Sequence, residues 1–373
     1  MKVTVDGIIY SLQSRGGISR TYHEILPRMC NIDPVLEISL LIFNHPQQAL
    51  PRHASICTSN LIPTIEQMLR PRRLWRPIVP AIKGLAKQLW LARFRGNIWH
   101  STYYTYPQIW NGPIIISVYD MIFEMFPEQF NRQEDEELRD QKRKCLLRAD
   151  AIISNSETTK QDVINFYGIQ PEKIHAIRLG FSSVFKQLRD DEIDPNQRFL
   201  RPFLLYVGKR SHNKNFGTLA RAYSAWNRKN EIKLIVVGEP WTKYEQESML
   251  KLDIAGKVQL IENASDKDLN ILYNQAFAFI YPSLYEGFGI PLLEAMACGC
   301  PVVASRIPST EEVAGEFPVY FEPQETDSLI DALDKVYSEG RGSDRVLLGM
   351  KKAQTYSWDR TAKQTLEVYD SLK

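Results

Sequence analysis

The sequence has little cysteine and no long apolar run, and both shortages exclude classes of protein. Its five cysteines, at positions 30, 57, 145, 298 and 300, lack the paired CxxC spacing of a structural zinc site. No apolar segment approaches the roughly 20 residues that a membrane-spanning helix needs. The chain begins directly on strand-like residues 2–5 rather than on a charged and then apolar secretory leader. We therefore expect a reduced, cytoplasmic protein that meets a membrane only peripherally.

A strong charge of either sign is also lacking, because the formal net charge is +2 over 373 residues. This near-neutral balance argues against a nucleic-acid partner. One basic segment is the exception, since residues 69–94 mix clustered Arg and Lys with Trp75 and Trp90. This pattern is typical of an amphipathic helix at an anionic bilayer, and equally of a solvated helix. A peripheral membrane contact through residues 69–94 is therefore a hypothesis.

Metal-ligand spacings are missing as well. The six histidines show no H-x3-H pattern, and the one Asp-x-Asp motif is formed by Asp266 and Asp268. Because Ser265 precedes it, this motif predicts a helix N-cap in which Ser265 and Asp268 bond each other's backbone. We expect a protein that uses neither a metal ion nor a cofactor.

The length indicates two domains, since one core typically uses about 100 to 200 residues. From residue 203 onward, short apolar runs alternate with amphipathic segments. The expected elements are 203–207, 216–228, 232–237, 258–261, 266–275, 278–281, 291–298, 301–304 and 326–337. The first half shows strand candidates at 3–10, 38–43, 98–101, 114–119, 151–154 and 174–179. Such alternation predicts α/β domains with parallel sheets.

A polar stretch at 186–201 separates the two halves and has the composition of a solvated linker. We therefore predict two Rossmann-like domains, residues 1–195 and 196–357. In such sheets, ligands bind on loops at the carboxyl ends of the strands.

The segment 285–294 combines several features that suit anion binding. Gly287 and Gly289 let backbone approach a ligand, and Pro291 favours the first turn of a helix that follows. The N–H groups at a helix N-terminus attract a diphosphate. Glu294 in that helix has acceptor oxygens for a ribose diol, and Glu286 on the loop for sugar hydroxyls. For a lone Glu at a helix start, the plain alternative is a favourable contact with the helix dipole.

A second loop, residues 208–215, also lies between a predicted strand and a predicted helix. Arg210 supplies a planar cationic fork and Lys214 a compact charge, which together suit a diphosphate whose charge grows as the nucleotide leaves. Lys209 is interpreted as a bystander. Two such loops at one sheet edge predict a shared anionic ligand.

Three motifs resemble those of a known family. They are the Glu-x7-Glu pattern of Glu286 and Glu294, residues 295–299 followed by 301–305, and residues 206–208 ahead of 214–215. The chain is similar to the retaining family-four glycosyltransferases of the GT-B fold, and to the mannosyltransferases of bacterial polysaccharide and lipopolysaccharide assembly among them. The resemblance implies two Rossmann-like domains that face each other across a cleft. It also implies a C-terminal helix, residues 358–373, that crosses back to an acceptor-binding N-terminal domain.

The resemblance further implies roles for individual residues of a nucleotide-sugar site. Arg210 and Lys214 would bind the diphosphate, Glu286 the transferred sugar and Glu294 the ribose. The turn formed by Gly16 and Gly17 would face the donor phosphates. The loop residues Gly287, Phe288 and Gly289 would complete the donor site.

One departure concerns the acceptor side, where many relatives carry a His-Asp pair at a strand end. This sequence has Tyr119 and Asp120 there. His100 ends the strand candidate 98–101 and is expected on a loop that could reach the same cleft. It is a substitute candidate, so His100 and Asp120 are both predicted acceptor-side contacts. The alternative for His100 is a hydrogen-bonded structural group.

The resemblance therefore predicts transfer of a hexose with retention of anomeric configuration. No nucleophilic carboxylate is evident, which favours a same-face route in which the leaving phosphate takes the acceptor proton. We favour GDP-mannose as donor and a glycan or lipid-linked acceptor. The alternatives are a UDP-sugar, a non-catalytic nucleotide-sugar-binding subunit, or a GT-B epimerase or phosphorylase.

Overall fold

A computed structural model describes residues 1–14, 16–43, 45–60, 91–94, 97–197, 199 and 202–372. The chain divides into two compact units, one made of Met1–Leu179 with Trp358–Lys373 and the other of Gly180–Ser357. Most of the predicted membrane segment, residues 69–90, lies outside the described residues. No helix among those described has the length and apolar content that crossing a bilayer would require.

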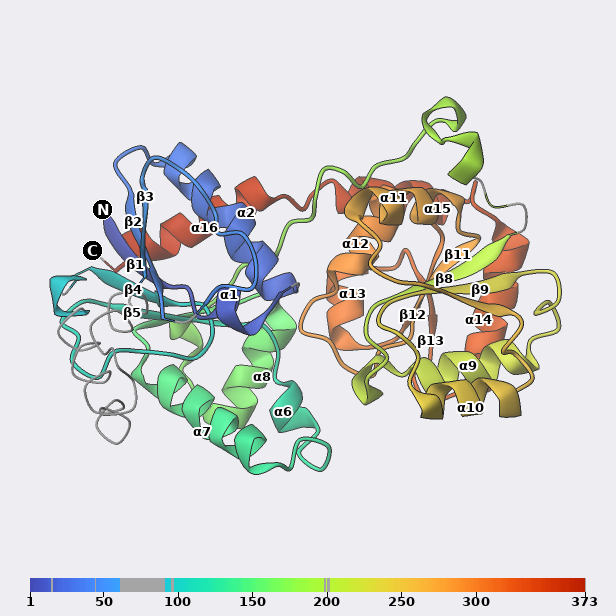
Figure 1. The fold of residues 1–373 in the computed structure, drawn as a ribbon, viewed down its shortest axis with the longest axis horizontal. Coiled ribbons are helices and arrows are strands. Elements are labelled where there is room, and N and C mark those ends of the chain that lie inside the picture. The colour runs from blue at the N-terminus through green and yellow to red at the C-terminus, as the bar shows by residue number, and fades with distance from the viewer. Residues whose placement is uncertain are drawn as a thin grey trace, which may run out of the picture. The chain divides into compact units, whose positions relative to one another are not determined.

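The first unit holds a parallel sheet that, within the described residues, has seven strands in the order β3-β2-β1-β4-β5-β6-β7. These strands are β1 (Lys2–Asp6), β2 (Glu37–Ile42), β3 (Ile56–Asn60), β4 (Ile98–Ser101), β5 (Ile114–Val118), β6 (Ala151–Ser154) and β7 (Ile174–Ala176). Figure 1 shows the helices of this unit on both faces of the sheet, with α2 and α16 on one side and α7 and α8 on the other. The helices are α1 (Ile9–Leu12), α2 (Gly17–Ile32), α6 (Ile122–Met125), α7 (Gln133–Arg148), α8 (Glu157–Tyr167) and α16 (Trp358–Asp370).

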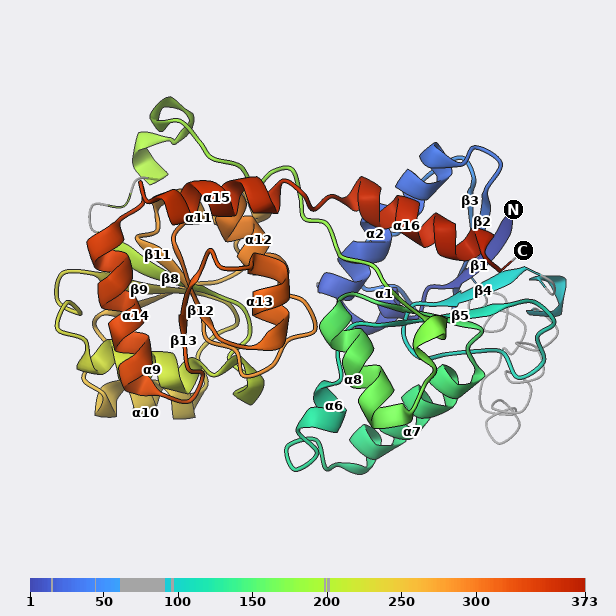
Figure 2. The same ribbon diagram turned by 180° about the vertical axis from the view of Figure 1, so that it is seen from behind.

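The last helix, α16, belongs to the first unit although it ends the chain. It packs along α2, and the two helices run side by side in Figures 1 and 2. Thr361 Oγ1 donates to the carbonyl oxygen of Arg178 at 2.9 Å, and Arg28 pairs with Asp359 at 3.2 Å. Trp358 at its start is 3% exposed. The prediction that a C-terminal helix returns to the first domain is confirmed.

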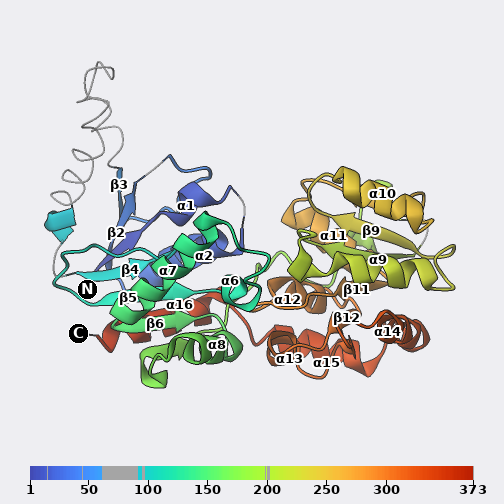
Figure 3. The same cartoon turned by 90° about the horizontal axis from the view of Figure 1, so that it is seen from below.

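The second unit is built on a parallel sheet that, among its described residues, has six strands in the order β10-β9-β8-β11-β12-β13. They are β8 (Phe203–Val207), β9 (Lys233–Val237), β10 (Val258–Ile261), β11 (Ala278–Tyr281), β12 (Val302–Ser305) and β13 (Val319–Phe321). The helices are α9 (Phe216–Ala225), α10 (Lys243–Lys251), α11 (Asp266–Gln275), α12 (Ile290–Ala297), α13 (Pro308–Ala314), α14 (Thr326–Glu339) and α15 (Asp344–Ala353). Helices α9 and α14 contact each other, whereas α12 contacts α11, α13 and α15. Figure 2 shows the strands between these two groups, and Figure 3 shows α13 and α15 side by side.

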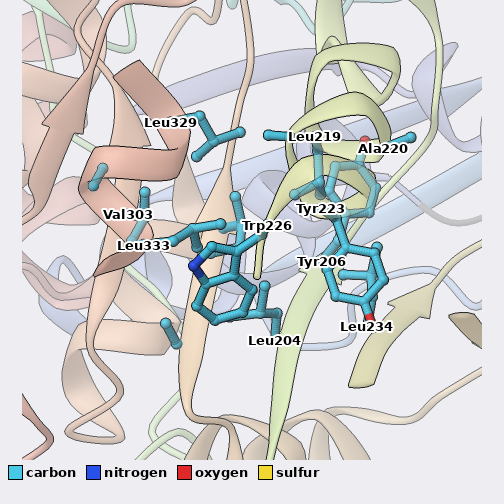
Figure 4. Packing of buried hydrophobic residues seen from close by; sticks show 14 of the residues in the cluster. Leu204, Tyr206, Leu219, Ala220, Tyr223, Trp226, Leu234, Val303, Leu329 and Leu333 are labelled. Atoms are coloured by element: carbon cyan, nitrogen blue, oxygen red, sulfur yellow. The ribbon is translucent and has the colours of Figure 1, made fainter. Parts of the chain in front are cut away.

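Continuous apolar strands explain the core of the second unit, because a sheet covered on both faces buries every strand position. Leu204 and Leu234 are fully buried and belong to the same hydrophobic cluster as Leu329 and Leu333 of α14 (Figure 4). Trp226, just after α9, is 1% exposed and its Nε1 donates to Asp334 at 2.8 Å. Burying a side chain of this size stabilises the fold by about 1.5–3 kcal/mol. This packing fixes the strand ends from which the loops of the site leave.

Most predicted elements agree with the structure, and β8, β10, α11 and β11 have the predicted bounds. The strand candidate 3–10 was too long, because the chain leaves β1 at Asp6 and turns into the helix α1. No prediction covered β3 or β13, which are respectively half polar and only three residues long. Contacts divide the units at residue 179, whereas the sequence boundary was set at 195. Segment 180–195 packs with α11, where the Lys186 and Leu188 amides bond Asn270 and Asn274.

Candidate functional site

The order of the strands brings two predicted loops together. In the second unit, the chain runs from β8 outward to β10 and then returns to β11 on the other side of β8. The loops after β8 and β11 therefore diverge at the switch point of the sheet, which is where open α/β sheets bind ligands. These loops are residues 208–215, which the sequence singled out, and 282–289, which overlaps the first half of the predicted segment 285–294.

Lys214 and Glu286 meet across this switch point. Lys214 Nζ lies 2.5 Å from Glu286 Oε1, and the side chains are 29% and 12% exposed. Ser283 donates its hydroxyl to the same carboxylate oxygen at 2.7 Å. Burial and the neighbouring Glu286 carboxylate raise the pKa of Tyr281. The site thus joins an ammonium group and a carboxylate, both partly open to solvent.

A tyrosine of β8 holds the backbone of the loop that follows this strand. Tyr206 in β8 donates its hydroxyl to the carbonyl oxygen of Lys209 at 2.5 Å, and burial raises the pKa of Tyr206. Asn215 adopts the left-handed conformation with φ 53° at the start of α9. Lys209 itself points outward with 74% exposure, 3.7 Å from Glu239.

Arg210 has a different environment from Lys214. Its side chain is only 4% exposed, and Nε donates to Glu245 Oε1 at 2.6 Å. Nη2 donates to Glu245 Oε2 at 3.3 Å and to the carbonyl oxygen of Pro240 at 2.9 Å. The guanidinium stacks over the ring of Trp241 at 4.3 Å. Arg210 is therefore near the predicted site, but protein groups already occupy most of its fork.

The helix after β11 was predicted at 291–298 and spans Ile290–Ala297 in the structure. Gly289, with φ 116°, is the N-cap of α12, and Pro291 lies in the first turn. At the other end, the amides of Gly299 and Cys300 bond the carbonyls of Met296 and Ala295, both at 3.0 Å. These are the two hydrogen bonds of a Schellman cap. The N-terminus of α12 thus follows directly on the loop 282–289.

Two residues of this segment are more enclosed than their predicted roles suggest. Phe288 is 3% exposed and packs edge-on against Tyr356, so its ring supports the loop from inside. Glu294, in the second turn of α12, is 5% exposed and accepts a hydrogen bond from Tyr273 at 3.4 Å. Its contact with a ribose stays a prediction, as does the role of Gly287.

In the first unit, Gly16 is the N-cap of α2, and Gly17 is the first residue of that helix. A Cβ on Gly16 would lie 2.2 Å from Oε1 of Gln13, an oxygen that accepts from the Ser19 amide at 3.3 Å. A side chain at position 16 would therefore require the flexible end of the Gln13 side chain to move. A contact of either glycine with donor phosphates stays a prediction.

The prediction that places His100 on a loop was wrong. His100 lies inside β4 and is 1% exposed. Its Nδ1 bonds the Tyr369 hydroxyl at 2.6 Å and its Nε2 bonds Ser117 Oγ at 2.8 Å. Burial lowers its pKa to about 3, so the ring is neutral at physiological pH. These contacts fit the structural alternative, since the imidazole joins α16 to the sheet.

Asp120 is at the carboxyl end of β5, as the sequence indicated. It is partly exposed, and Oδ1 accepts from the Ile122 amide at 3.2 Å. Lys142 lies beneath this turn, fully buried, and donates to the Asp120 carbonyl at 3.3 Å. The same ammonium group is 2.8 Å from Glu124. The acceptor-side role of Asp120 stays a prediction.

Sequence reasoning missed two carboxylates. Asp6 ends β1, is fully buried, and accepts hydrogen bonds from Thr102 Oγ1 at 2.7 Å and Ser101 Oγ at 3.1 Å. Burial raises its pKa to about 6. Glu245 belongs to a capping box with Thr242 at the start of α10. The Thr-x-x-Glu spacing was visible in the sequence, but its contact with Arg210 was not.

The structure describes no cluster of three or more His, Cys, Asp or Glu side chains that could hold a metal ion within its described ranges. Asp266 and Asp268 instead belong to the predicted cap of α11, where Ser265 accepts from the Asp268 amide and Asp268 from the Ser265 amide. The predicted N-cap of α11 is confirmed.

Comparison with known families accounts for both units. Residues 190–349 match the family described as glycosyl transferases group 1, and residues 16–183 match glycosyltransferase family 4. The chain belongs to the family-four glycosyltransferases. It shares the GT-B fold of that family, with two Rossmann-like domains built on parallel sheets.

Relatives and solved structures support this assignment. The glycosyltransferase is 25% identical over 296 residues to the O-antigen chain mannosyltransferase B of Escherichia coli, covering 77% of each chain. It is 28% identical over 236 residues to the O-antigen chain mannosyltransferase RfbU of Salmonella typhimurium, covering 63% of this chain and 64% of that one.

Two solved structures share its fold along the whole chain. Sucrose-phosphate synthase from Thermosynechococcus elongatus has a TM-score of 0.79 at 18% identity, covering 100% of this chain and 98% of that one. Anabaena HepE, solved with UDP and glucose, has a TM-score of 0.73 at 16% identity, covering 100% of both chains.

Proposed function

We propose that this glycosyltransferase transfers a hexose from a nucleoside-diphosphate sugar, with the donor bound at the switch point of the second unit. The observation that carries the proposal is the pair formed by Lys214 and Glu286, whose charged atoms lie 2.5 Å apart on the loops after β8 and β11. One cation and one carboxylate at a single point suit a ligand that presents a phosphate next to sugar hydroxyls.

Each residue has a chemical role in this proposal. Lys214 and Arg210 neutralise the diphosphate and the charge that grows on it as the nucleotide leaves. The N-terminus of α12, with Gly287 and Gly289 before it, adds backbone N–H groups to the same anion. Glu286 orients the transferred sugar and Glu294 accepts from the ribose hydroxyls. Gly16 and Gly17 approach the phosphates from the first unit.

We propose retention of anomeric configuration by a same-face route. Glu286 and Glu294 are committed to hydroxyl groups, so neither serves as a nucleophile at the anomeric carbon. The leaving phosphate oxygen takes the acceptor proton, which requires mainly positioning and charge stabilisation. Proton NMR of the product tests this step, because a coupling pattern for the inverted anomer would contradict it.

Mannose from GDP-mannose is the donor that we favour, because two of the relatives are named O-antigen chain mannosyltransferases. Their names also favour a glycan or lipid-linked acceptor in polysaccharide or lipopolysaccharide assembly. The alternative donor is a UDP-sugar, which the structures of Anabaena HepE with UDP and UDP-glucose favour. Thermal-shift measurements with GDP, UDP and their sugars decide between them, because a ligand at 100 times its Kd stabilises by about 2.7 kcal/mol.

Transfer by the purified protein separates an enzyme from a non-catalytic binding subunit. We expect release of nucleoside diphosphate from the donor that the thermal-shift screen selects, and loss of this release in Glu286→Ala. A protein that binds the donor tightly but turns over no more than Glu286→Ala would be the binding subunit.

The acceptor side belongs to the first unit in this proposal, with Asp120 as its candidate contact. We also propose that the protein works in the cytoplasm, with residues 69–94 touching an anionic membrane surface. Flotation with vesicles of phosphatidylglycerol tests this contact, and protein that stays entirely at the bottom of the gradient would contradict it.

A further inference from the structure

Arg210 is held by a clamp that extends from the loop after β9 into α10. Nε and Nη2 of the guanidinium both donate to the carboxylate of Glu245, at 2.6 and 3.3 Å. The ring of Trp241 lies against the guanidinium plane at 4.3 Å, and the Pro240 carbonyl accepts from Nη2 at 2.9 Å. A bidentate bond and a stacked ring together fix both the position and the plane of the group.

The carboxylate of Glu245 is itself anchored. Its Oε2 accepts from the amide of Thr242 at 2.7 Å and from the Thr242 hydroxyl at 2.8 Å. The first of these bonds, together with the bond from the Glu245 amide to the Thr242 hydroxyl at 3.2 Å, forms the capping box of α10. Because both partners are fixed, the arginine has one orientation rather than the many rotamers of a free side chain.

Nη1 is the guanidinium nitrogen of Arg210 that makes no hydrogen bond within the clamp. It is buried and has no hydrogen-bond partner among the described residues. It faces the ends of β8 and β9, where Gly208 and Gly238 have no side chains. A Cβ on Gly238 would lie 3.0 Å from Nη1 and 2.6 Å from the carbonyl oxygen of Gly208. A buried guanidinium N–H without a partner is costly, which is a reason to expect an anionic partner during function.

We propose that Glu245 and Trp241 are positioning residues that aim Nη1 of Arg210 at a phosphate oxygen of the donor, beside the glycines that end β8 and β9. This inference rests on the proposed function, since it assumes a nucleoside-diphosphate ligand. Lys214 places a positive charge beside that ligand, whereas the clamp fixes the orientation of the Arg210 guanidinium. Glu245 acts through Arg210 and touches no substrate.

The test compares ligands that differ only in phosphate number. Binding of nucleoside, nucleoside monophosphate and nucleoside diphosphate is measured by calorimetry for the wild type and Glu245→Gln, in both the guanosine and the uridine series. We expect Glu245→Gln to weaken the diphosphate about tenfold, because an oriented hydrogen bond to a charged group is lost, and to leave the nucleoside unchanged. Glu247→Gln removes the same charge from an exposed position of α10 and should change neither ligand.

A double-mutant cycle makes the assignment specific. In an Arg210→Met background, Glu245→Gln should have no further effect on diphosphate binding. Equal weakening of all three ligands by Glu245→Gln would show that the clamp only supports the loop. Tighter diphosphate binding would show that Glu245 competes with phosphate for the arginine. Either result overturns the inference, whereas a wild type that binds neither diphosphate overturns the proposed function instead.

Discussion

In the second unit, Lys214 and Glu286 lie on loops at the sheet switch point and keep part of their surface in solvent. In the first unit, which is built on the same kind of parallel sheet, the corresponding polar groups are enclosed. Asp6 and His100 are buried and hydrogen-bonded within their own unit. The same architecture therefore leaves these strand-end groups partly open to solvent in one unit and largely encloses them in the other.

Replacing Lys142 tests this comparison, and we expect a large effect on stability. Its ammonium group and the Glu124 carboxylate lie 2.8 Å apart at 0% and 5% exposure, so Lys142→Met leaves an uncompensated buried charge. We expect this variant to lower the free energy of unfolding of the first unit by about 3–5 kcal/mol. Urea denaturation measures the loss of stability. Hydrogen exchange of the backbone amides then shows whether the first or the second unit has lost it.

The matched control for Lys142→Met is Lys144→Met on the same helix. Lys144 pairs with Asp140 at 2.5 Å, but both side chains are more than half exposed, at 58% and 57%. Solvent screens such a pair, so its loss should be much smaller. Equal stability of the two variants would show that the enclosed charges of the first unit are not structural.

The next test changes activity rather than stability. Lys214→Met removes the cation that faces Glu286 and should lower kcat for transfer about 100-fold, because the charge on the leaving diphosphate loses its partner. Lys209→Met changes a residue of the same loop whose side chain is 74% exposed. Because solvent screens this charge, the variant should lower kcat less than threefold. Steady-state rates with the selected donor give the ratio. Comparable losses in both variants would mean that loop charge in general, rather than one placed ammonium, matters.

The two units also differ in how far their sites could be predicted. Lys214, Glu286 and Gly289 belong to short segments between a strand and a helix, so their spacing alone indicated an anion site, and the structure brings Lys214 and Glu286 together. The contact between His100 and Tyr369 spans 269 positions, and no local pattern reports it. The bond of Arg210 to Glu245 likewise depends on how two loops approach, although each residue was visible separately.

Differences in burial explain which strands of the fold could be predicted from the sequence. Apolar runs identified the buried strands β8 and β11, because a strand that is covered on both faces is apolar throughout. The edge strand β3 was not predicted, since its residues are largely exposed and partly polar. Burial, rather than pairing, produces the signal on which strand prediction depends.

A smaller effect on stability is expected from Tyr369→Phe. The variant removes the hydroxyl that bonds Nδ1 of His100 at 2.6 Å and leaves a buried imidazole nitrogen without that partner. We expect the first unit to lose about 1–3 kcal/mol, measured by thermal unfolding. Tyr244→Phe, at a position in the second unit that is 79% exposed, should leave the melting temperature unchanged. A silent Tyr369→Phe would contradict the idea that this bond holds α16.

The smallest expected effect is a change in pH dependence. Burial lowers the pKa of His100 to about 3 from 6.5, so the unfolded chain binds this proton first and stability falls as pH drops from about 6.5. Burial raises the pKa of Asp6 to about 6 from 3.8, so the folded chain binds that proton first and stability rises as pH drops from about 6 to 3.8. Between pH 6 and 4 the two contributions oppose each other, each reaching at most about 1.4 kcal/mol per pH unit.

Variants separate these two contributions. His100→Gln leaves the Asp6 contribution alone, so the stability of the first unit should depend on pH with a slope shifted toward stabilisation by acid. Asp6→Asn should shift the slope in the opposite sense. Denaturation midpoints at several pH values give the slopes, and comparing slopes cancels the constant cost of each substitution. If both variants kept the wild-type slope, the two groups would titrate alike in the folded and unfolded states, and the enclosed strand ends of the first unit would differ less from the open ones of the second than the structure implies.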